Sequence, residues 1–281
     1  MTTARRTLLG AAAWLSLAAW CSAADAQGSL AYVSNEGSGQ VSVLDTSRDE
    51  VLATLAVGGQ PRGLALSPDG RILYLSDKAG NRLQVVRTGD GRTETTVPLG
   101  ESPEGISLSP DGRLVAAACE IDNAVVLVDA VRGERIAAIR TSGKNPEHAV
   151  FSPDGPDGRQ AYVACELDNA VHAIDVASHR PIVRIPAGEF ANGLAMHPCG
   201  HELYISNGRG GSVSVIDVPT QAVVATIAVR KRPWNMALTA HGGKLYVANG
   251  RSDSVSVIDP ARRTKFADIA VGKLPWGVVI R

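Results

Sequence analysis

The residues best suited to chemistry stand at equivalent places in a turn that recurs through the sequence. Each turn is rich in glycine, most hold a proline, and a short apolar run follows. The residue directly before the apolar run differs from turn to turn, and the six are Arg62, Glu104, Glu147, Asn192, Trp234 and Trp276. The next position holds Gly63, Gly105, His148, Gly193, Asn235 and Gly277. A position kept for structure alone would repeat one residue type, so this variation predicts a ligand- or partner-binding site.

The side chains at these positions leave more than one interpretation open. Trp234 and Trp276 are suited to stacking on a planar ligand or anchoring a protein partner, and equally to covering a channel or packing between repeats. Glu104 and Glu147 would hold a cation or remain solvated charges at a rim, and the second interpretation is favoured because carboxylates are mostly exposed. The predicted site is completed by Arg62, Asn192, His148 and Asn235.

Two cysteines share one place in the repeat. Cys119 and Cys165 replace the asparagine or aspartate that most other repeats have there. Together with His148 they are candidates for a copper or zinc site, since thiolate and imidazole suit these metals, but their spacing matches no known ligand motif. A disulfide needs Cα atoms within about 7 Å of each other. We therefore expect two separate thiols, no metal and no cofactor.

The sequence also lacks the common catalytic motifs. It contains no Gly-x-Ser-x-Gly elbow, no phosphate-binding loop and no His-Glu-x-x-His. Its 28 basic and 28 acidic side chains balance, so nothing indicates a nucleic-acid partner. After the N-terminal segment, no apolar stretch reaches the roughly eighteen residues of a membrane-spanning helix. A binding function is therefore favoured over an enzymatic one.

A four-residue motif, with tyrosine first in five of its six copies, shows that the chain is built from repeats. Its copies are YVSN (32–35), YLSD (74–77), AAAC (116–119), YVAC (162–165), YISN (204–207) and YVAN (246–249). The steps are 42, 42, 46, 42 and 42 residues, and the long step contains an insertion, SPDGPDGRQ (152–160). Three more apolar segments follow each copy, such as VSVLD (41–45), VLATLAV (51–57) and GLALS (63–67). Four strands in a period of about 40–45 residues are typical of a β-propeller.

We therefore predict an all-β fold, a six-bladed β-propeller of four-stranded antiparallel blades. The chain enters at the second strand of a blade (LAYVS, 30–34) and ends on a first strand (PWGVVIR, 275–281). The C-terminal strand is expected to pair with the N-terminal blade, which removes two exposed edges. Residues 27–281 then form a single monomeric domain. In a propeller the variable turns and the loops after the tyrosine motif share one face, so the predicted site lies at the mouth of the central channel.

The first 26 residues do not belong to the repeats and have the composition of a leader segment. Arg5 and Arg6 precede an apolar run from Leu8 to Trp20, and Ala24-Asp25-Ala26 resembles a cleavage site. This pattern predicts a secretory signal peptide over residues 1–26, of either the ordinary or the twin-arginine type. The mature protein is expected to be exported to the periplasm.

The repeats resemble the YVTN family of β-propeller repeats. The resemblance rests on Tyr-Val-x-Asn, Val-Ser-Val-Ile-Asp, Gly-x-x-Pro and Ser-Pro-Asp-Gly, and it covers nearly all of residues 27–281. NGRSDSVSVID (249–259) and VGKLPWGVVI (271–280) are similar to the subgroup associated with pyrroloquinoline-quinone (PQQ)-dependent alcohol catabolism. That family often has seven blades, whereas six are counted here.

The resemblance implies a periplasmic, non-catalytic binding or accessory protein. Its partner would be a quinoprotein dehydrogenase, a cytochrome or a small ligand. One alternative is a lactonase-like hydrolase that uses the central channel, with Arg62, Glu104, Glu147 and His148 as its candidate residues. Another is an interaction protein of the cell envelope.

Overall fold

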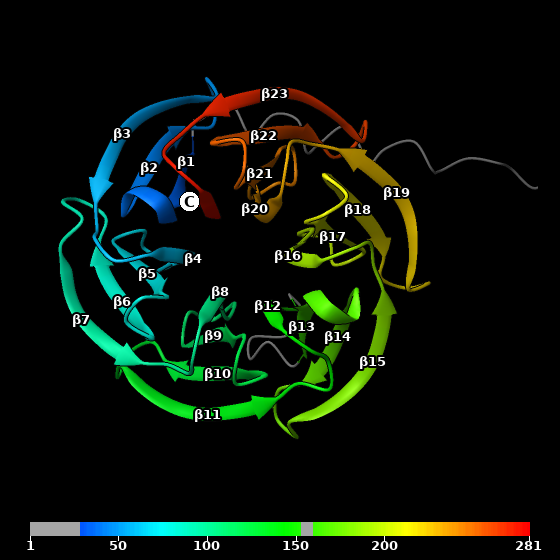
Figure 1. The fold of residues 1–281 in the computed structure, drawn as a ribbon, viewed down its shortest axis with the longest axis horizontal. Helices are drawn as coiled ribbons and strands as arrows, with labels where there is room; N and C mark the ends of the chain where they lie inside the picture. The colour runs from blue at the N-terminus through cyan, green and yellow to red at the C-terminus, as the bar shows by residue number, and fades with distance from the viewer. Residues whose placement is uncertain (1–28, 153–159) are drawn as a thin grey trace, which may run out of the picture.

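Each repeat forms one antiparallel sheet of four short strands, because its apolar runs of five to seven residues are separated by turn residues. The computed structural model describes residues 29–152 and 160–281, and it contains six such sheets. The predicted signal peptide and most of the 152–160 insertion lie outside the described residues. In Figure 1 the sheets surround a common axis, with one strand of each nearest to it.

We number the sheets as blades 1 to 6 and give their strands from the axis outward. Blade 1 is β24 (Pro275–Ile280), β1 (Leu30–Asn35), β2 (Gln40–Asp45) and β3 (Glu50–Ala56). Blade 2 is β4 (Pro61–Leu66), β5 (Ile72–Asp77), β6 (Arg82–Arg87) and β7 (Thr93–Pro98). Blade 3 is β8 (Pro103–Leu108), β9 (Leu114–Cys119), β10 (Ala124–Asp129) and β11 (Glu134–Arg140).

The remaining blades repeat this order. Blade 4 is β12 (Pro146–Phe151), β13 (Gln160–Cys165), β14 (Ala170–Asp175) and β15 (Arg180–Pro186). Blade 5 is β16 (Ala191–Met196), β17 (Glu202–Asn207), β18 (Ser212–Asp217) and β19 (Ala222–Ala228). Blade 6 is β20 (Pro233–Leu238), β21 (Leu245–Asn249), β22 (Ser254–Asp259) and β23 (Thr264–Ala270). Two single-turn 3₁₀ helices, η2 (Glu36–Ser38) and η3 (Glu166–Asp168), follow β1 and β13. No helix of the described ranges has the length and apolarity needed to cross a bilayer.

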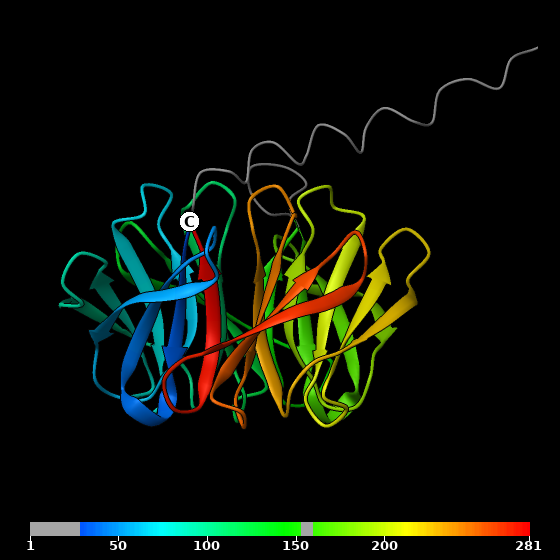
Figure 2. The same ribbon diagram turned by 90° about the horizontal axis from the view of Figure 1, so that it is seen from above.

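The C-terminal strand closes the ring, as the phase of the repeats predicted. β24 pairs antiparallel with β1, with Ala31 opposite Ile280 and Val33 opposite Val278. The last strand lies beside the first in both views (Figures 1 and 2). The core also crosses this junction, because Ala31, Val33 and Leu44 of blade 1 form one buried cluster with Tyr246 and Val255 of blade 6. Closure therefore pairs the edges of the first blade and buries its face.

A β-bulge lies near the start of each innermost strand. In blade 2, Pro61 pairs with Asp77 and Leu64 with Leu75, so Arg62 and Gly63 together oppose Ser76. Each other innermost strand shifts register at the equivalent place. A bulge redirects a side chain out of the regular alternation. The variable residues of the predicted site are the bulged ones, which is why they do not follow the alternation of the strand.

The residue after the bulged one is usually glycine because neighbouring innermost strands approach closely there. A Cβ atom on Gly193 would lie 2.3 Å from the Trp234 carbonyl oxygen, and one on Gly63 would lie 2.5 Å from that of Glu104. No side chain fits at such distances. In blades 1, 2 and 5 the third residue of the tyrosine motif is a serine, which joins neighbouring blades at this level. Ser76 Oγ accepts a hydrogen bond from the Gly63 N–H at 2.8 Å and donates to the Glu104 carbonyl of the next blade.

Candidate functional site

The six bulged residues meet at one end of the axis, and we call them the mouth cluster: Arg62, Glu104, Glu147, Asn192, Trp234 and Trp276. Arg62 donates to Glu104 of the next blade, and its guanidinium carbon lies 6.0 Å from the centroid of the Trp276 ring. Asn192 Nδ2 donates to Glu147 Oε2 at 3.0 Å. The rings of Trp234 and Trp276 stack with centroids 6.4 Å apart and planes at 25°. These contacts bring residues distant in sequence together, while their role in binding stays a prediction.

The two glutamates of the cluster are buried. Glu104 and Glu147 are 0% and 6% exposed, so the interpretation as solvated rim charges is wrong. The bulge turns both carboxyls inward between adjacent blades, where Glu104 also accepts from Ser102 Oγ at 2.9 Å and lies 3.7 Å from Lys78 Nζ.

Burial sets the protonation of this pair. It raises the pKa of Glu104 to about 7, against the opposing effect of the Arg62 charge. Burial also raises the pKa of Glu147 well above its usual range, and the neighbouring Glu104 charge adds to the rise. Desolvation and a like charge both favour the neutral acid. Glu104 thus exchanges its proton near neutral pH, a property shared by general acids and bases.

A second layer of charged residues surrounds the cluster. These residues directly follow the tyrosine-motif strands, and in blades 1 to 4 they are Glu36, Lys78, Glu120 and Glu166. Glu36 pairs with Arg62 at 3.0 Å, and Glu166 pairs with Arg232 at 2.8 Å. Glu120 accepts from Asn145 Nδ2 at 2.9 Å, and its Oε2 lies 3.0 Å from Ser102 Oγ. Sequence reasoning did not include this layer, although its fixed place in the repeat was the signal that could have found it.

The two tryptophans differ in accessibility. Trp276 is only 1% exposed, so its ring packs inside the cluster. Trp234 is half-buried, and a Cβ atom on Gly250 would lie 2.0 Å from its ring. The absence of a side chain at Gly250 makes room for this indole. Trp276 therefore packs within the protein, whereas Trp234 keeps an exposed part of its ring that a ligand could contact.

His148 and Asn235 are not part of the mouth cluster, contrary to expectation. Both line a hollow of about 470 Å³ together with apolar residues such as Met196, and the Ser-Pro-Asp-Gly turns that border this hollow belong to the opposite ends of the blades. His148 Nδ1 accepts from the Leu194 N–H at 3.0 Å, which leaves Nε2 to donate to the Ile106 carbonyl at 3.2 Å. Burial lowers its pKa to about 4. A neutral imidazole with both nitrogens bonded joins three blades and has no lone pair left for a metal.

Comparison with known proteins places the fold in a family. The model of the family described as "Lactonase, 7-bladed beta-propeller" matches residues 22–136 and 134–265. The chain belongs to this family. The described part of this lactonase-family propeller has six blades where the family description has seven. A search of curated proteins gave no match.

Solved structures share the fold of the lactonase-family propeller. A chain of Kuenenia stuttgartiensis hydrazine synthase is 22% identical with a TM-score of 0.68, over 88% of this chain and 84% of that one. A functionally unknown protein from Desulfotomaculum acetoxidans is 13% identical with a TM-score of 0.68, over 89% and 98%. A chain of a nidogen/laminin complex is 15% identical with a TM-score of 0.75, over 90% and 98%. At such identities the likeness concerns the fold alone.

The cysteines of the described residues, Cys119, Cys165 and Cys199, are free. Cys119 and Cys165 are fully buried, and burial raises the pKa of each thiol to about 12. In residues 29–152 and 160–281, no three His, Cys, Asp or Glu side chains are grouped as a metal site. The weak metal candidates Cys119, Cys165 and His148 are therefore not brought together.

Two buried polar atoms of the mouth cluster have no partner within the described part of the chain. They are Arg62 Nε, which donates, and Asn192 Oδ1, which accepts. Buried polar groups are nearly always hydrogen-bonded, so these two unsatisfied atoms, which belong to blades 2 and 5, require an explanation. A bound molecule that carries both an acceptor and a donor would satisfy the two atoms.

Proposed function

We propose that this lactonase-family protein is an exported binding propeller that holds a small, hydroxyl-bearing ligand at the mouth cluster. The observation that carries the proposal is the pair of unsatisfied atoms, Arg62 Nε and Asn192 Oδ1. A hydroxyl group donates to the amide oxygen and accepts from the guanidinium N–H, so one ligand type serves both. Trp234 offers the flat apolar surface on which the carbon skeleton of such a ligand would lie.

The proposed setting is the periplasm, where the protein would be an accessory to PQQ-dependent alcohol oxidation. The support is the resemblance of residues 249–259 and 271–280 to that subgroup, and the predicted signal peptide over residues 1–26. The ligand would then be an alcohol or one of its oxidation products. The partner would be a quinoprotein dehydrogenase or its cytochrome.

Tryptophan fluorescence tests ligand binding directly. Residues 27–281 contain only two tryptophans, Trp234 and Trp276, and both belong to the mouth cluster. Titration with alcohols and polyols should change their emission in a saturable way, and Asn192→Ala should weaken the binding. Thr95→Ala on the exposed outer strand β7 is the matched control. If no hydroxyl compound gives a saturable change, or if the Asn192 variant binds as the wild type does, the mouth cluster is not the ligand site.

Partner and export are tested in cells. The wild-type protein from alcohol-grown cells should co-purify with a dehydrogenase or cytochrome, and Trp234→Ala should reduce the yield. Trp234 is preferred to Trp276 because the buried ring of Trp276 also supports the fold. Replacing Arg5 and Arg6 by lysine should block export only if the signal is of the twin-arginine type.

Lactone hydrolysis is the second candidate function, favoured by the family match and by Glu104. A carboxyl whose pKa is about 7 is suited to general-base catalysis. Ionised Glu104 would take a proton from a water molecule as it adds to the lactone carbonyl, and Arg62 would stabilise the oxyanion. The ring C–O bond then breaks, and protonated Glu104 would return its proton to the leaving oxygen to give a hydroxy acid.

Acid release from simple lactones tests this candidate. Activity should rise with pH around 7 and should be lost in Glu104→Gln, with Glu134→Gln on the exposed strand β11 as the control. Equal rates in the wild type and the Glu104 variant would eliminate Glu104 as the base.

A further inference from the structure

A strongly basic pocket lies beside the mouth, between blades 5 and 6. Its volume is about 780 Å³, and five cationic side chains line it: Arg209, Arg230, Lys231, Arg232 and Arg251. They come from the loop after β17, the connection from β19 to β20, and the turn after β21. None of the six residues of the mouth cluster lines the pocket, so it is a separate feature of the molecule.

Only part of this positive charge is balanced. Arg230 pairs with Asp268 and Arg232 pairs with Glu166, both at 2.8 Å. Within residues 29–152 and 160–281, no carboxylate lies within ion-pair distance of Arg209, Lys231 or Arg251. The chain as a whole is neutral, with 28 basic and 28 acidic side chains, so this is a local excess of positive charge. Such an excess in a concave site raises the local concentration of anions.

The repeat shows how the excess arises. Blades 3 and 4 have Glu120-Ile121 and Glu166-Leu167 directly after the tyrosine motif, whereas blades 5 and 6 have Gly208-Arg209 and Gly250-Arg251. An acid is replaced by glycine and an apolar residue by arginine, at the same two positions in both blades. The mouth is therefore acidic on one side and basic on the other.

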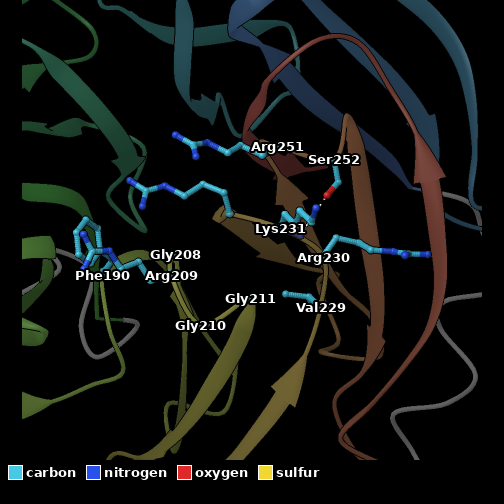
Figure 3. Close-up of a pocket in the computed structure, with 11 residues that line it drawn as sticks. Phe190, Gly208, Arg209, Gly210, Gly211, Val229, Arg230, Lys231, Arg251 and Ser252 are labelled. Carbon is cyan, nitrogen blue, oxygen red and sulfur yellow. Dashed lines mark hydrogen bonds between the residues drawn. The ribbon is translucent and has the colours of Figure 1, made fainter.

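An aromatic ring holds two of the cations in place. The guanidinium carbons of Arg209 and Arg232 lie 4.0 and 5.1 Å from the centroid of the Phe190 ring, a distance at which cation–π attraction operates. Figure 3 shows Arg209 lying against Phe190, Arg251 extending from the other side of the pocket and Arg230 directed away. The backbone of Phe190 is fixed by a 2.8 Å bond from its N–H to Asn169 Oδ1. Arginines that are already positioned lose less conformational entropy when they bind.

We propose that this basic pocket binds a small molecule that carries at least two anionic oxygens, either a dicarboxylate or a phosphate group. Guanidinium groups bind both through paired N–H···O hydrogen bonds, and the volume is within the usual range for small-molecule sites. Arg209 and Arg251 are the specific contacts because neither has an internal acidic partner within 4 Å in the described residues. The charges gather in a hollow and do not form a stripe, which favours a small anion over a nucleic acid.

Calorimetric titration of the full mature protein tests the proposal. The probes are inorganic phosphate and a four-carbon dicarboxylate, with chloride as the monovalent control. Arg209→Gln with Arg251→Gln removes two positive charges from the pocket. Arg92→Gln with Arg140→Gln removes two from exposed positions elsewhere and is the matched control.

We expect saturable binding of at least one dianion, weakened about tenfold for each guanidinium removed, and unchanged in the control variant. Added salt should also weaken it. Binding of phosphate alone identifies a phosphate ligand, and binding of the dicarboxylate alone identifies a carboxylate ligand. The proposal is overturned if neither dianion binds more tightly than chloride, or if the pocket variant binds as the wild type does. Asn192→Ala should leave this binding intact, so the outcome is independent of the proposed function of the mouth.

Discussion

Glu104→Gln replaces a buried carboxyl by a neutral amide of similar shape. This substitution should remove a loss of stability that the carboxyl causes in the wild type as pH rises. The pKa of Glu104 rises from 4.5 to about 7 on folding. Because the folded protein prefers the neutral acid, the contribution of Glu104 to stability is highest below pH 4.5 and falls as pH rises through 7. A shift of this size corresponds to about 3 kcal/mol once the group is fully ionised in both states. About 2 kcal/mol of this loss falls between pH 5.5 and 8.5.

The assay is urea unfolding followed by the emission of Trp234 and Trp276, repeated across that pH range. The free energy of unfolding of Glu104→Gln, relative to wild type, should increase by about 2 kcal/mol from pH 5.5 to 8.5. The variant also removes the charge that helps to raise the pKa of Glu147, which acts in the same direction. Glu134→Gln, at an exposed position, should follow the wild type at every pH. Parallel stability curves for Glu104→Gln and wild type would refute the reasoning.

Three further substitutions test the fold around the mouth. Gly193→Ala places a Cβ atom 2.3 Å from the Trp234 carbonyl oxygen, and should destabilise the protein by about 1–3 kcal/mol or more in urea unfolding; stability equal to wild type would contradict the close approach. Ser76→Ala leaves the Gly63 N–H and the Glu104 carbonyl without their partner and should lower the free energy of unfolding by about 1–3 kcal/mol, whereas an exposed Ser47→Ala should not. His148→Gln should gain stability relative to wild type as pH falls from 6.5 toward 4, because folding lowers the pKa of His148 to about 4 and the variant lacks this group; a constant difference between the two unfolding free energies across this range would disprove this.

The fold was predictable from sequence because repetition averages out local ambiguity. A single run such as VSVLD is weak support for a strand, but six copies in the same order establish both the strand order and the phase at the two ends. The same logic located the mouth cluster, since equivalent positions of a closed ring must meet. The closure between β1 and β24 followed from that phase alone.

Burial and pairing at the mouth were not predictable in the same way. A bulge turns Glu104 inward, and no pattern in the sequence distinguishes this from an outward rim position. His148 directly follows the bulged Glu147, and its bonds to Ile106 and Leu194 of the neighbouring innermost strands could not be read from the sequence. The basic pocket depends on charges in two neighbouring blades and on the ring of Phe190, and these come together only in three dimensions.

The pairing of β24 with β1 has a consequence for how the protein is made. Residues 275–280 leave the ribosome after every other strand of the propeller, yet they complete the blade that begins at Leu30. Until then, β1 is an unsatisfied edge that another nascent chain could occupy. Contacts separated by almost the whole chain also slow the final folding step. A stop codon before residue 275 would therefore release a chain with this edge uncovered and prone to self-association.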